Sequence, residues 1–178
     1  MGKLIESTFV TLDGVISHPE RWGSPYWDDE HTSYATKMLF GADALLLGRA
    51  TYDNFASAWP SRSNDDPYTA RINAMPKYVA STTLTETTWN ASVLEGDVAG
   101  GVARVKDEGT TLLKFGTGVL DRTLLAHGLV DELHLWTFPV IAGAGDRLLD
   151  GLDVTHFDLV DTVRFGSGIV VHVCTPKP

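Results

Sequence analysis

Two glycines flank a threonine where an apolar segment of the chain gives way to an amphipathic one. Phe115 is followed by Gly116, Thr117, Gly118 and Val119. We expect a strand to end here and a helix to follow, with Thr117 as its cap and Gly128 as its stop. A helix start presents unpaired amides and a partial positive charge, which suits a pyrophosphate group. The motif is shorter than the full dinucleotide fingerprint, and an ordinary strand-to-helix turn uses the same glycines. Both interpretations stay open.

A second candidate for chemistry is Arg49, which follows the apolar run of residues 44–47 and Gly48. Open α/β sheets bind ligands at the carboxyl ends of their strands, and a guanidinium is a planar, permanently charged donor for phosphate. A third segment, residues 77–83, ends in the hydroxyls of Ser81 and Thr82, whereas sites that prefer NAD commonly place a carboxylate there. Taken alone, Arg49 is more typical of a surface ion pair and Ser81 of a turn.

The pattern of apolar residues predicts the elements that position these side chains. Residues 4–10, 44–47, 78–80 and 111–115 are short apolar runs, which suit strands of a largely parallel sheet with helices on each side. Helical spacing appears in residues 28–40, 52–56, 98–106 and 117–128. Residues 133–138 alternate as a strand, and residues 157–165 and 169–174 flank a Gly-Ser-Gly turn, which indicates a hairpin. We therefore predict one α/β domain over residues 1–178, with a mixed sheet.

Composition narrows the class of protein. The 178 residues suffice for one buried core, and the formal net charge of −9 disfavours nucleic acid and acidic membranes as partners. Cys174 is the single cysteine, so no internal disulfide can form. His31, His134 and His172 lack metal-ligand spacing, and we expect no metal site. No segment resembles an export signal or a membrane span, so we expect a cytoplasmic protein.

In succession, these segments resemble the dihydrofolate reductase superfamily and the reductase domains of riboflavin biosynthesis, especially the small bacterial proteins named after dihydrofolate reductase. The similarity extends from about Lys3 to Val173. It is carried by residues 11–16 (TLDGVI), 47–52 (LGRATY), 77–84 (KYVASTTL), 116–118 (GTG), 128–133 (GLVDEL) and 139–149 (PVIAGAGDRLL). The order of these segments is specific for the family and only weakly specific for a substrate.

The resemblance implies a dihydrofolate-reductase-like fold and NADPH as cofactor. It assigns the adenosine phosphate and diphosphate to Gly48, Arg49 and Thr51, and the 2′-phosphate also to Ser81 and Thr82. It assigns the diphosphate cradle to Gly116, Thr117, Gly118 and Val119. It assigns the loop against the nicotinamide and the substrate to Leu12, Asp13, Gly14, Val15 and Ile16. Relatives often carry a basic residue just after the serine, where this chain has Thr82 and Thr83. Only Arg49 is left for the 2′-phosphate, which weakens the expected preference for NADPH over NADH.

The substrate end is less defined. True folate reductases carry a pocket carboxylate on the helix after the first loop, and the acids at that place here are Asp28, Asp29 and Glu30. One of them would supply a proton or anchor the substrate. Alternatively, acids in the first turn of a helix complement its dipole and need no other role. Trp27 is one of several tryptophans that would stack on a flat heterocycle or pack in the core.

Together these observations predict an NADPH-dependent reductase that transfers hydride to a small heterocyclic, pterin- or pyrimidine-like substrate. The rival interpretation is a catalytically silent dinucleotide-binding module, or an assembly protein, that retains the fold. The resemblance further implies a homodimer formed through residues 133–138 and the C-terminal hairpin, although these segments would equally close the core of a monomer.

Overall fold

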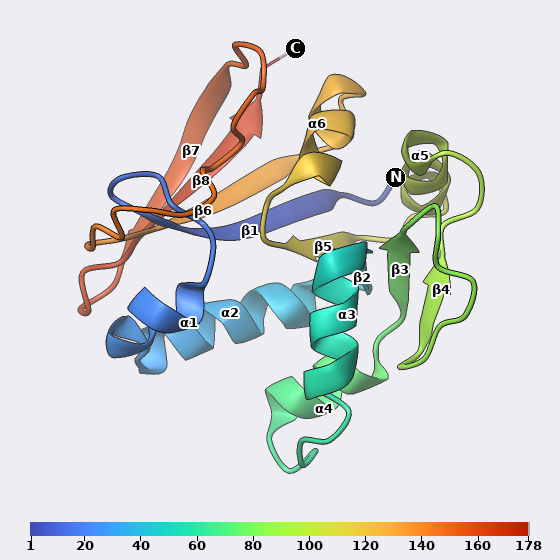
Figure 1. The fold of residues 1–178 in the computed structure, drawn as a ribbon, viewed down its shortest axis with the longest axis horizontal. Helices are drawn as coiled ribbons and strands as arrows, with labels where there is room; N and C mark the ends of the chain where they lie inside the picture. The colour runs from blue at the N-terminus through green and yellow to red at the C-terminus, as the bar shows by residue number, and fades with distance from the viewer. Residues whose placement is uncertain (178) are drawn as a thin grey trace. The chain divides into compact units, whose positions relative to one another are not determined.

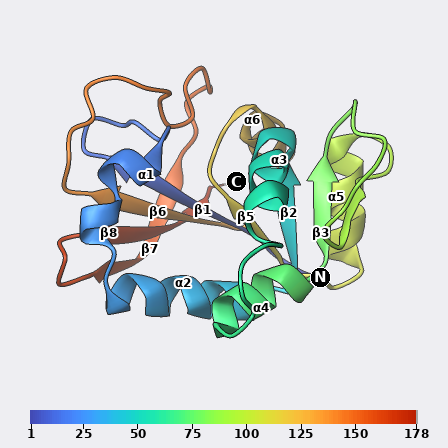
Figure 2. The ribbon, with the colours of Figure 1, turned by 60° about the horizontal axis from the view of Figure 1, so that its bottom comes forward.

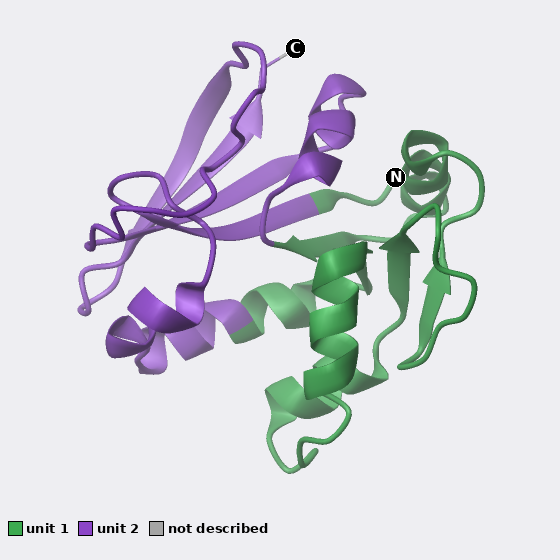
Figure 3. Ribbon diagram, viewed as in Figure 1, with its two compact units in different colours: residues 1–4, 36–115 green, residues 5–35, 116–178 purple. Residues whose placement is uncertain are grey.

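The computed structural model describes residues 1–177, whose strands form an eight-stranded sheet in the order β4-β3-β2-β5-β1-β6-β8-β7 (Figure 1). The pairs β1/β6, β2/β3, β2/β5 and β3/β4 are parallel, whereas β6/β8 and β7/β8 are antiparallel. This confirms the predicted mixed, mostly parallel sheet with a C-terminal antiparallel hairpin. The chain divides into two compact units, residues 1–4 with 36–115 and residues 5–35 with 116–178 (Figure 3). Each unit is described by itself.

The first unit is a parallel sheet with helices between its strands in the sequence. Its strands are β2 (Ala44–Gly48), β3 (Lys77–Ala80), β4 (Ala91–Val93) and β5 (Leu112–Phe115), and its helices are α3 (Arg49–Ala58), α4 (Pro67–Ala74) and α5 (Val98–Asp107). Leu45, Leu46, Leu47, Leu112 and Leu113 are fully buried. Strands that are apolar on both faces are what a sheet covered by helices requires. Figure 2 shows β2 and β3 pointing the same way with α3 beside them.

The second unit combines β1 (Leu4–Thr11) with β6 (Glu132–Phe138), β8 (Val170–Pro176) and β7 (Phe157–Arg164). Its helices are α1 (Pro19–Trp22), the 3₁₀ turn η1 (Ser24–Tyr26), the first half of α2 (Asp29–Gly41) and α6 (Val119–Ala126). Phe9 of β1 pairs in register with Trp136 of β6, so both side chains lie on one face of the sheet. Trp136 and Phe138 are fully buried. The core of this unit therefore combines aromatic rings with buried aliphatic side chains such as Leu124, Ile169 and Val171.

Most elements lie where the sequence predicts them, with four additions and one correction. The structure adds the short elements α1 and η1, the helix α4, which Asp66 caps by accepting from the Thr69 amide at 2.8 Å, and the three-residue edge strand β4. The prediction that Thr117 caps α6 is wrong. Gly118 is the N-cap, and its N–H donates to the carboxylate of Asp121 in the first turn. Within residues 1–177, no helix has the length and apolar character needed to cross a bilayer.

Candidate functional site

The carboxyl ends of β2 and β3 bring two of the predicted segments together in the first unit. Gly48, the last residue of β2, pairs in register with Ala80, the last residue of β3. Gly48 is also the N-cap of α3, so Arg49 is the first residue of that helix. Arg49 and Ser81 therefore occupy equivalent positions just beyond two neighbouring strands. This is the edge at which open α/β sheets bind ligands.

Arg49 is fixed by an ion pair with Asp53, one turn further along α3. Its Nε donates to both carboxylate oxygens, at 3.0 and 2.8 Å, and its Nη1 lies 3.5 Å from the Thr83 hydroxyl oxygen. The Arg49 side chain keeps 43% of its surface exposed. The surface ion pair considered for Arg49 is thus present, and it holds the guanidinium toward the segment that follows β3.

Ser81 forms a tight turn rather than pointing outward. Its Oγ accepts hydrogen bonds from the amides of Thr83, at 3.3 Å, and Leu84, at 3.1 Å. Short hydroxyl side chains form such local turns readily. The turn folds Thr83 back toward Arg49 and leaves Thr82 exposed. Thr83 is therefore the hydroxyl that meets the guanidinium, a role the sequence analysis did not assign. The sequence signal for this turn was the serine itself, whose hydroxyl can accept from amides two and three residues later.

The glycine-flanked turn of residues 116–119 lies in the second unit, between β5 and α6. Gly116 has φ +71°, a conformation that favours glycine, and a Cβ built on Gly116 or Gly118 would meet no atom within 4 Å. The Oγ1 of Thr117 is buried and has no hydrogen-bond partner among residues 1–177. The open space beside Gly116 and Gly118 would admit a phosphate group, and the buried Thr117 hydroxyl would meet it once the side chain turns outward. The Gly118 amide, however, is taken by Asp121, so the turn offers fewer amides than a full dinucleotide motif.

The predicted nicotinamide and substrate loop, residues 12–16, is anchored through the carboxylate of Asp13. Its Oδ1 accepts from the Thr11 hydroxyl at 2.6 Å and the Ala142 amide at 3.0 Å, and its Oδ2 accepts from the Gly143 amide at 2.8 Å. These hydrogen bonds lower the pKa of Asp13 to about 2, and the bond from Thr11 has the largest effect. Asp13 is therefore a charged tie between this loop and residues 139–147.

Backbone hydrogen bonds extend that tie along both segments. The Leu12 amide donates to the Val140 carbonyl at 2.8 Å, and the Ile16 amide donates to the Asp146 carbonyl at 2.9 Å. Gly14 has φ +83°, and Val15 is fully buried at an isolated antiparallel bridge. Leu12 and Ile141, by contrast, are 64% and 71% exposed. The loop is thus fixed in backbone and presents apolar side chains to the surface.

The three candidate acids at the start of α2 have other contacts or face solvent. Asp28 accepts from the His31 amide at 2.8 Å, and this hydrogen bond is the main reason that its pKa is lowered. Glu30 accepts from the Gly166 amide in the β7–β8 turn, and Asp29 is exposed. The interpretation of these acids as helix-start residues accounts for Asp28 and Asp29. The structure does not single out any of the three as a proton donor.

His31, one turn into α2, is the residue at this end that the predicted site omitted. Its ring centroid lies 5.6 Å from that of Phe9, 5.7 Å from Trp27 and 5.1 Å from Trp136. Burial lowers the pKa of His31, and the nearby Asp28 carboxylate opposes that shift in part. Its Nε2 is buried and has no hydrogen-bond partner in the described part of the chain. Its position three residues after Asp28, on the face with Tyr34, was the available sequence signal.

Comparison with known proteins decides the family. The family model described as the RibD C-terminal domain matches residues 2–171. The chain belongs to the RibD C-terminal domain family. This is a family of reductase domains, which supports an oxidoreductase and confirms the predicted resemblance to riboflavin-biosynthesis reductases.

Relatives of this RibD C-terminal domain protein match over nearly its whole length. A protein of Bacillus subtilis (strain 168), the uncharacterized protein YyaP, is 30% identical over 177 residues, which cover 94% of this chain and 92% of that one. A putative riboflavin biosynthesis protein from Shewanella sp. PV-4 has a TM-score of 0.79 at 22% identity and covers 99% of both chains. A pyrimidine reductase-like protein from Corynebacterium diphtheriae has a TM-score of 0.67 at 13% identity, covering 99% of this chain and 92% of that one.

A longer structural neighbour places the match within a larger protein. The diaminohydroxyphosphoribosylaminopyrimidine deaminase/5-amino-6-(5-phosphoribosylamino)uracil reductase of Thermotoga maritima has a TM-score of 0.68 at 15% identity. The alignment covers 99% of this RibD C-terminal domain protein and 57% of the Thermotoga chain. At such identities the likeness shows the shared fold alone.

Proposed function

We propose that this protein is an NADPH-dependent reductase that transfers hydride to a small heterocyclic substrate of the pterin or pyrimidine type. The observation that carries the proposal is the arrangement at the ends of β2 and β3, where the Arg49 guanidinium is oriented by Asp53 toward the Thr83 hydroxyl. Membership in a family of reductase domains supports the redox chemistry. The structural neighbours of this chain include a pyrimidine reductase-like protein, which supports the substrate class.

The residues of the first unit fit the 2′-phosphate of NADPH. A dianionic phosphate favours a planar, charged donor together with hydroxyls, and Arg49 and Thr83 provide both. No acid follows β3 in the segment Ser81-Thr82-Thr83, so nothing there resembles the carboxylate that grips the ribose in NAD sites. Arg49 would therefore distinguish NADPH from NADH. When bound, the cofactor would supply the hydride at its nicotinamide ring.

Two features of the second unit fit the remainder of that chemistry. A diphosphate would occupy the open space beside Gly116 and Gly118, and the buried, unsatisfied Thr117 hydroxyl would turn outward to hydrogen-bond to one of its oxygens. The loop of residues 12–16 would lie against the nicotinamide and the substrate. Its backbone is tied down through Asp13 before any ligand binds, so little ordering cost would remain at binding.

A catalytically silent dinucleotide-binding module is the second candidate. It is favoured by one observation, that Asp28 caps a helix and Glu30 holds the β7–β8 turn. Neither carboxylate then serves as a ready proton donor, and hydride transfer to a C=N or C=O bond needs a proton. This candidate predicts cofactor binding without turnover.

Fluorescence titration of the full chain with NADPH and with NADH tests the cofactor, and NADPH oxidation followed optically against pterins, pyrimidines, quinones and small carbonyl compounds tests the chemistry. The proposal expects tighter binding of NADPH than of NADH and turnover of at least one heterocycle. Binding without any turnover would favour the silent module. An absence of NADPH binding would refute both candidates.

A further inference from the structure

An aromatic cluster in the second unit surrounds the imidazole of His31. We name it the His31 cluster and define it as Phe9, Trp27, His31 and Trp136. Phe9 and Trp136 face each other across β1 and β6, and both contact the His31 ring, at 5.6 and 5.1 Å between centroids. Trp27 stacks on His31 at 5.7 Å with 19° between the ring planes. The imidazole is therefore in contact with three other rings.

Packing alone does not explain a histidine at this position. The Nε2 atom is buried, and no residue of the described chain hydrogen-bonds to it. A buried polar atom without a partner costs stability, whereas a phenylalanine ring would fill the same space without that cost. Trp136 cannot be the partner, because its Nε1 donates to the Ser7 hydroxyl at 3.0 Å. The nitrogen thus has no partner in the described chain, and a ligand group would reach it once a covering side chain moves aside.

Tyr34 shows what a satisfied polar ring looks like on the same helix. It lies one turn after His31 and contacts Trp136 at the same centroid distance, 5.1 Å. Its hydroxyl is 2.9 Å from Nδ1 of His134, whose Nε2 lies 3.2 Å from the Glu132 carboxylate. The Tyr34 hydroxyl has a hydrogen-bond partner, whereas Nε2 of His31 has none among residues 1–177. The contrast separates the His31 cluster from ordinary core packing.

Trp27 lies at the surface and stacks on the His31 ring. Its exposed fraction is 48%, which is large for an indole that stacks on a half-buried ring. It lies outside the regular helices, between η1 and α2, with φ −79° and ψ 115°. A half-exposed indole offers a rigid flat face to a planar ring. Movement of the Trp27 side chain would expose the face of the His31 ring on which the indole stacks.

We propose that His31 and Trp27 bind the heterocyclic substrate, with Nε2 of His31 accepting a hydrogen bond from a ring N–H and the indole of Trp27 stacking on the ring. The inference rests on the proposed function and names the residues of its substrate end. Burial lowers the pKa of His31, which favours the neutral imidazole and so leaves one nitrogen as an acceptor. Lactam N–H groups of pterins and uracils match this acceptor.

The test uses the full chain with His31→Phe, and Tyr34→Phe as the matched control on the same helix. Isothermal titration with pterin and with 5-aminouracil measures the substrate end, and titration with NADPH is run separately on each variant. For His31→Phe we expect a melting temperature no lower than that of the wild type, and affinity for at least one heterocycle reduced by about tenfold or more. For Tyr34→Phe we expect the reverse, a lower melting temperature and unchanged affinity.

The outcomes separate this inference from the proposed function. Unchanged heterocycle affinity in His31→Phe overturns the inference, whatever NADPH does. Absence of heterocycle binding by the wild type to about millimolar concentration also overturns it. Failure of NADPH to bind would instead refute the proposed cofactor. Trp27→Ala supplies an independent arm, since loss of the stacked indole should weaken heterocycle binding and leave NADPH affinity as it was; equal heterocycle affinity in that variant would remove Trp27 from the site.

Discussion

Asp53 accepts two hydrogen bonds from the Nε of Arg49, one helical turn away in α3, and so fixes the direction of the guanidinium at the end of β2. The same guanidinium meets Thr83 through Nη1. An arginine that is oriented before a ligand arrives loses little side-chain entropy at binding. The ion pair therefore does not compete with a role in phosphate binding but prepares for it.

Arg49→Ala should weaken NADPH binding and leave NADH binding nearly unchanged. A charge-assisted hydrogen bond contributes roughly 1.5–3 kcal/mol, so we expect NADPH affinity to fall by about 10- to 100-fold. Fluorescence titration with both coenzymes measures the two affinities side by side. The control is Arg62→Ala, because Arg62 is a cation of the same unit whose guanidinium lies over the Trp59 ring at 4.1 Å. An equal loss for NADPH and NADH would contradict the assignment of Arg49 to the 2′-phosphate.

Thr117→Val should separate binding from stability. Valine has the shape of threonine without the buried hydroxyl, whose Oγ1 has no partner in residues 1–177. Removing an unsatisfied polar atom should leave the melting temperature unchanged or raise it. If the hydroxyl serves a diphosphate oxygen, NADPH and NADH should both bind about 3- to 10-fold more weakly. Thermal unfolding and coenzyme titration of the one variant test the two statements, and full affinity for both coenzymes would remove Thr117 from the site.

The sequence predicts the strand-to-helix junctions of this fold well, because they depend on local signals. Gly128 has φ +61° after the last turn of α6, as a helix-ending glycine should, and Arg49 lies where the apolar run of β2 stops. The contact between Arg49 and Thr83 could not be predicted in the same way. It depends on the register of β2 with β3, which does not follow from the spacing of residues, and on the turn formed by Ser81, which the sequence offered as one of two interpretations.

The substrate end was harder to predict for a related reason. Asp28, Asp29 and Glu30 are equivalent as a sequence pattern, and only the packing of α2 distinguishes the residue that caps a helix from the one that holds a distant turn. His31 gave no metal-ligand or catalytic spacing in the sequence. Its significance comes from rings contributed by β1 and β6, which are far from it in the chain. The helical spacing of His31 with Tyr34 indicates a shared face, but it does not identify the rings that this face meets.

Asp13→Asn should destabilise the protein at neutral pH and lose that effect in acid. The folded pKa of Asp13 is about 2, below the ordinary 3.8, so the carboxylate contributes stability above 3.8 that is lost as the pH falls through 2. The NH₂ group of an asparagine side chain would face the backbone N–H of either Ala142 or Gly143, so that two donors would meet. The melting temperature of Asp13→Asn should therefore be lower than that of the wild type at pH about 7. At pH about 2 the two melting temperatures should be nearly equal. A constant difference across this range would contradict the charge-based account.

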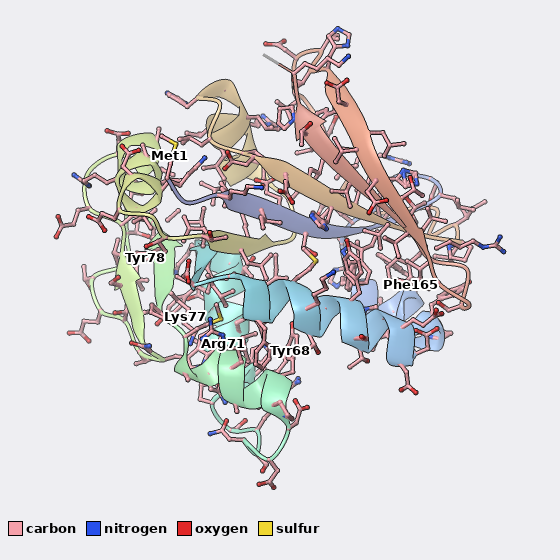
Figure 4. The ribbon with its side chains drawn as sticks, turned by 180° about the vertical axis from the view of Figure 1, so that it is seen from behind. Met1, Tyr68, Arg71, Lys77, Tyr78 and Phe165 are labelled. Atoms are coloured by element: carbon pink, nitrogen blue, oxygen red, sulfur yellow. The ribbon has the colours of Figure 1, made fainter. Side chains whose placement is uncertain are left out.

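Lys77→Met should stabilise the protein at neutral pH by removing a buried charge. Lys77, labelled in Figure 4, is 1% exposed. Its Nζ donates to the Asn73 carbonyl in α4 at 2.9 Å and lies 4.1 Å from the Trp89 ring centroid. Burial nevertheless lowers its pKa from 10.5 to about 8. Between these values the unfolded chain holds a proton that the folded chain has released, so the stability of the wild type rises with pH through this window.

The advantage of Lys77→Met over the wild type should accordingly shrink by up to about 3 kcal/mol between pH about 7 and pH about 10.5, since one pKa unit corresponds to about 1.4 kcal/mol. Urea unfolding of both proteins at the two pH values gives this difference, in which groups common to both cancel. Lys37→Met is the control, because Lys37 is exposed on α2 and should give a difference that hardly changes with pH. If the advantage of Lys77→Met stays constant or grows with pH, the lysine is held charged in the fold, and the cation–π contact with Trp89 outweighs the cost of burial.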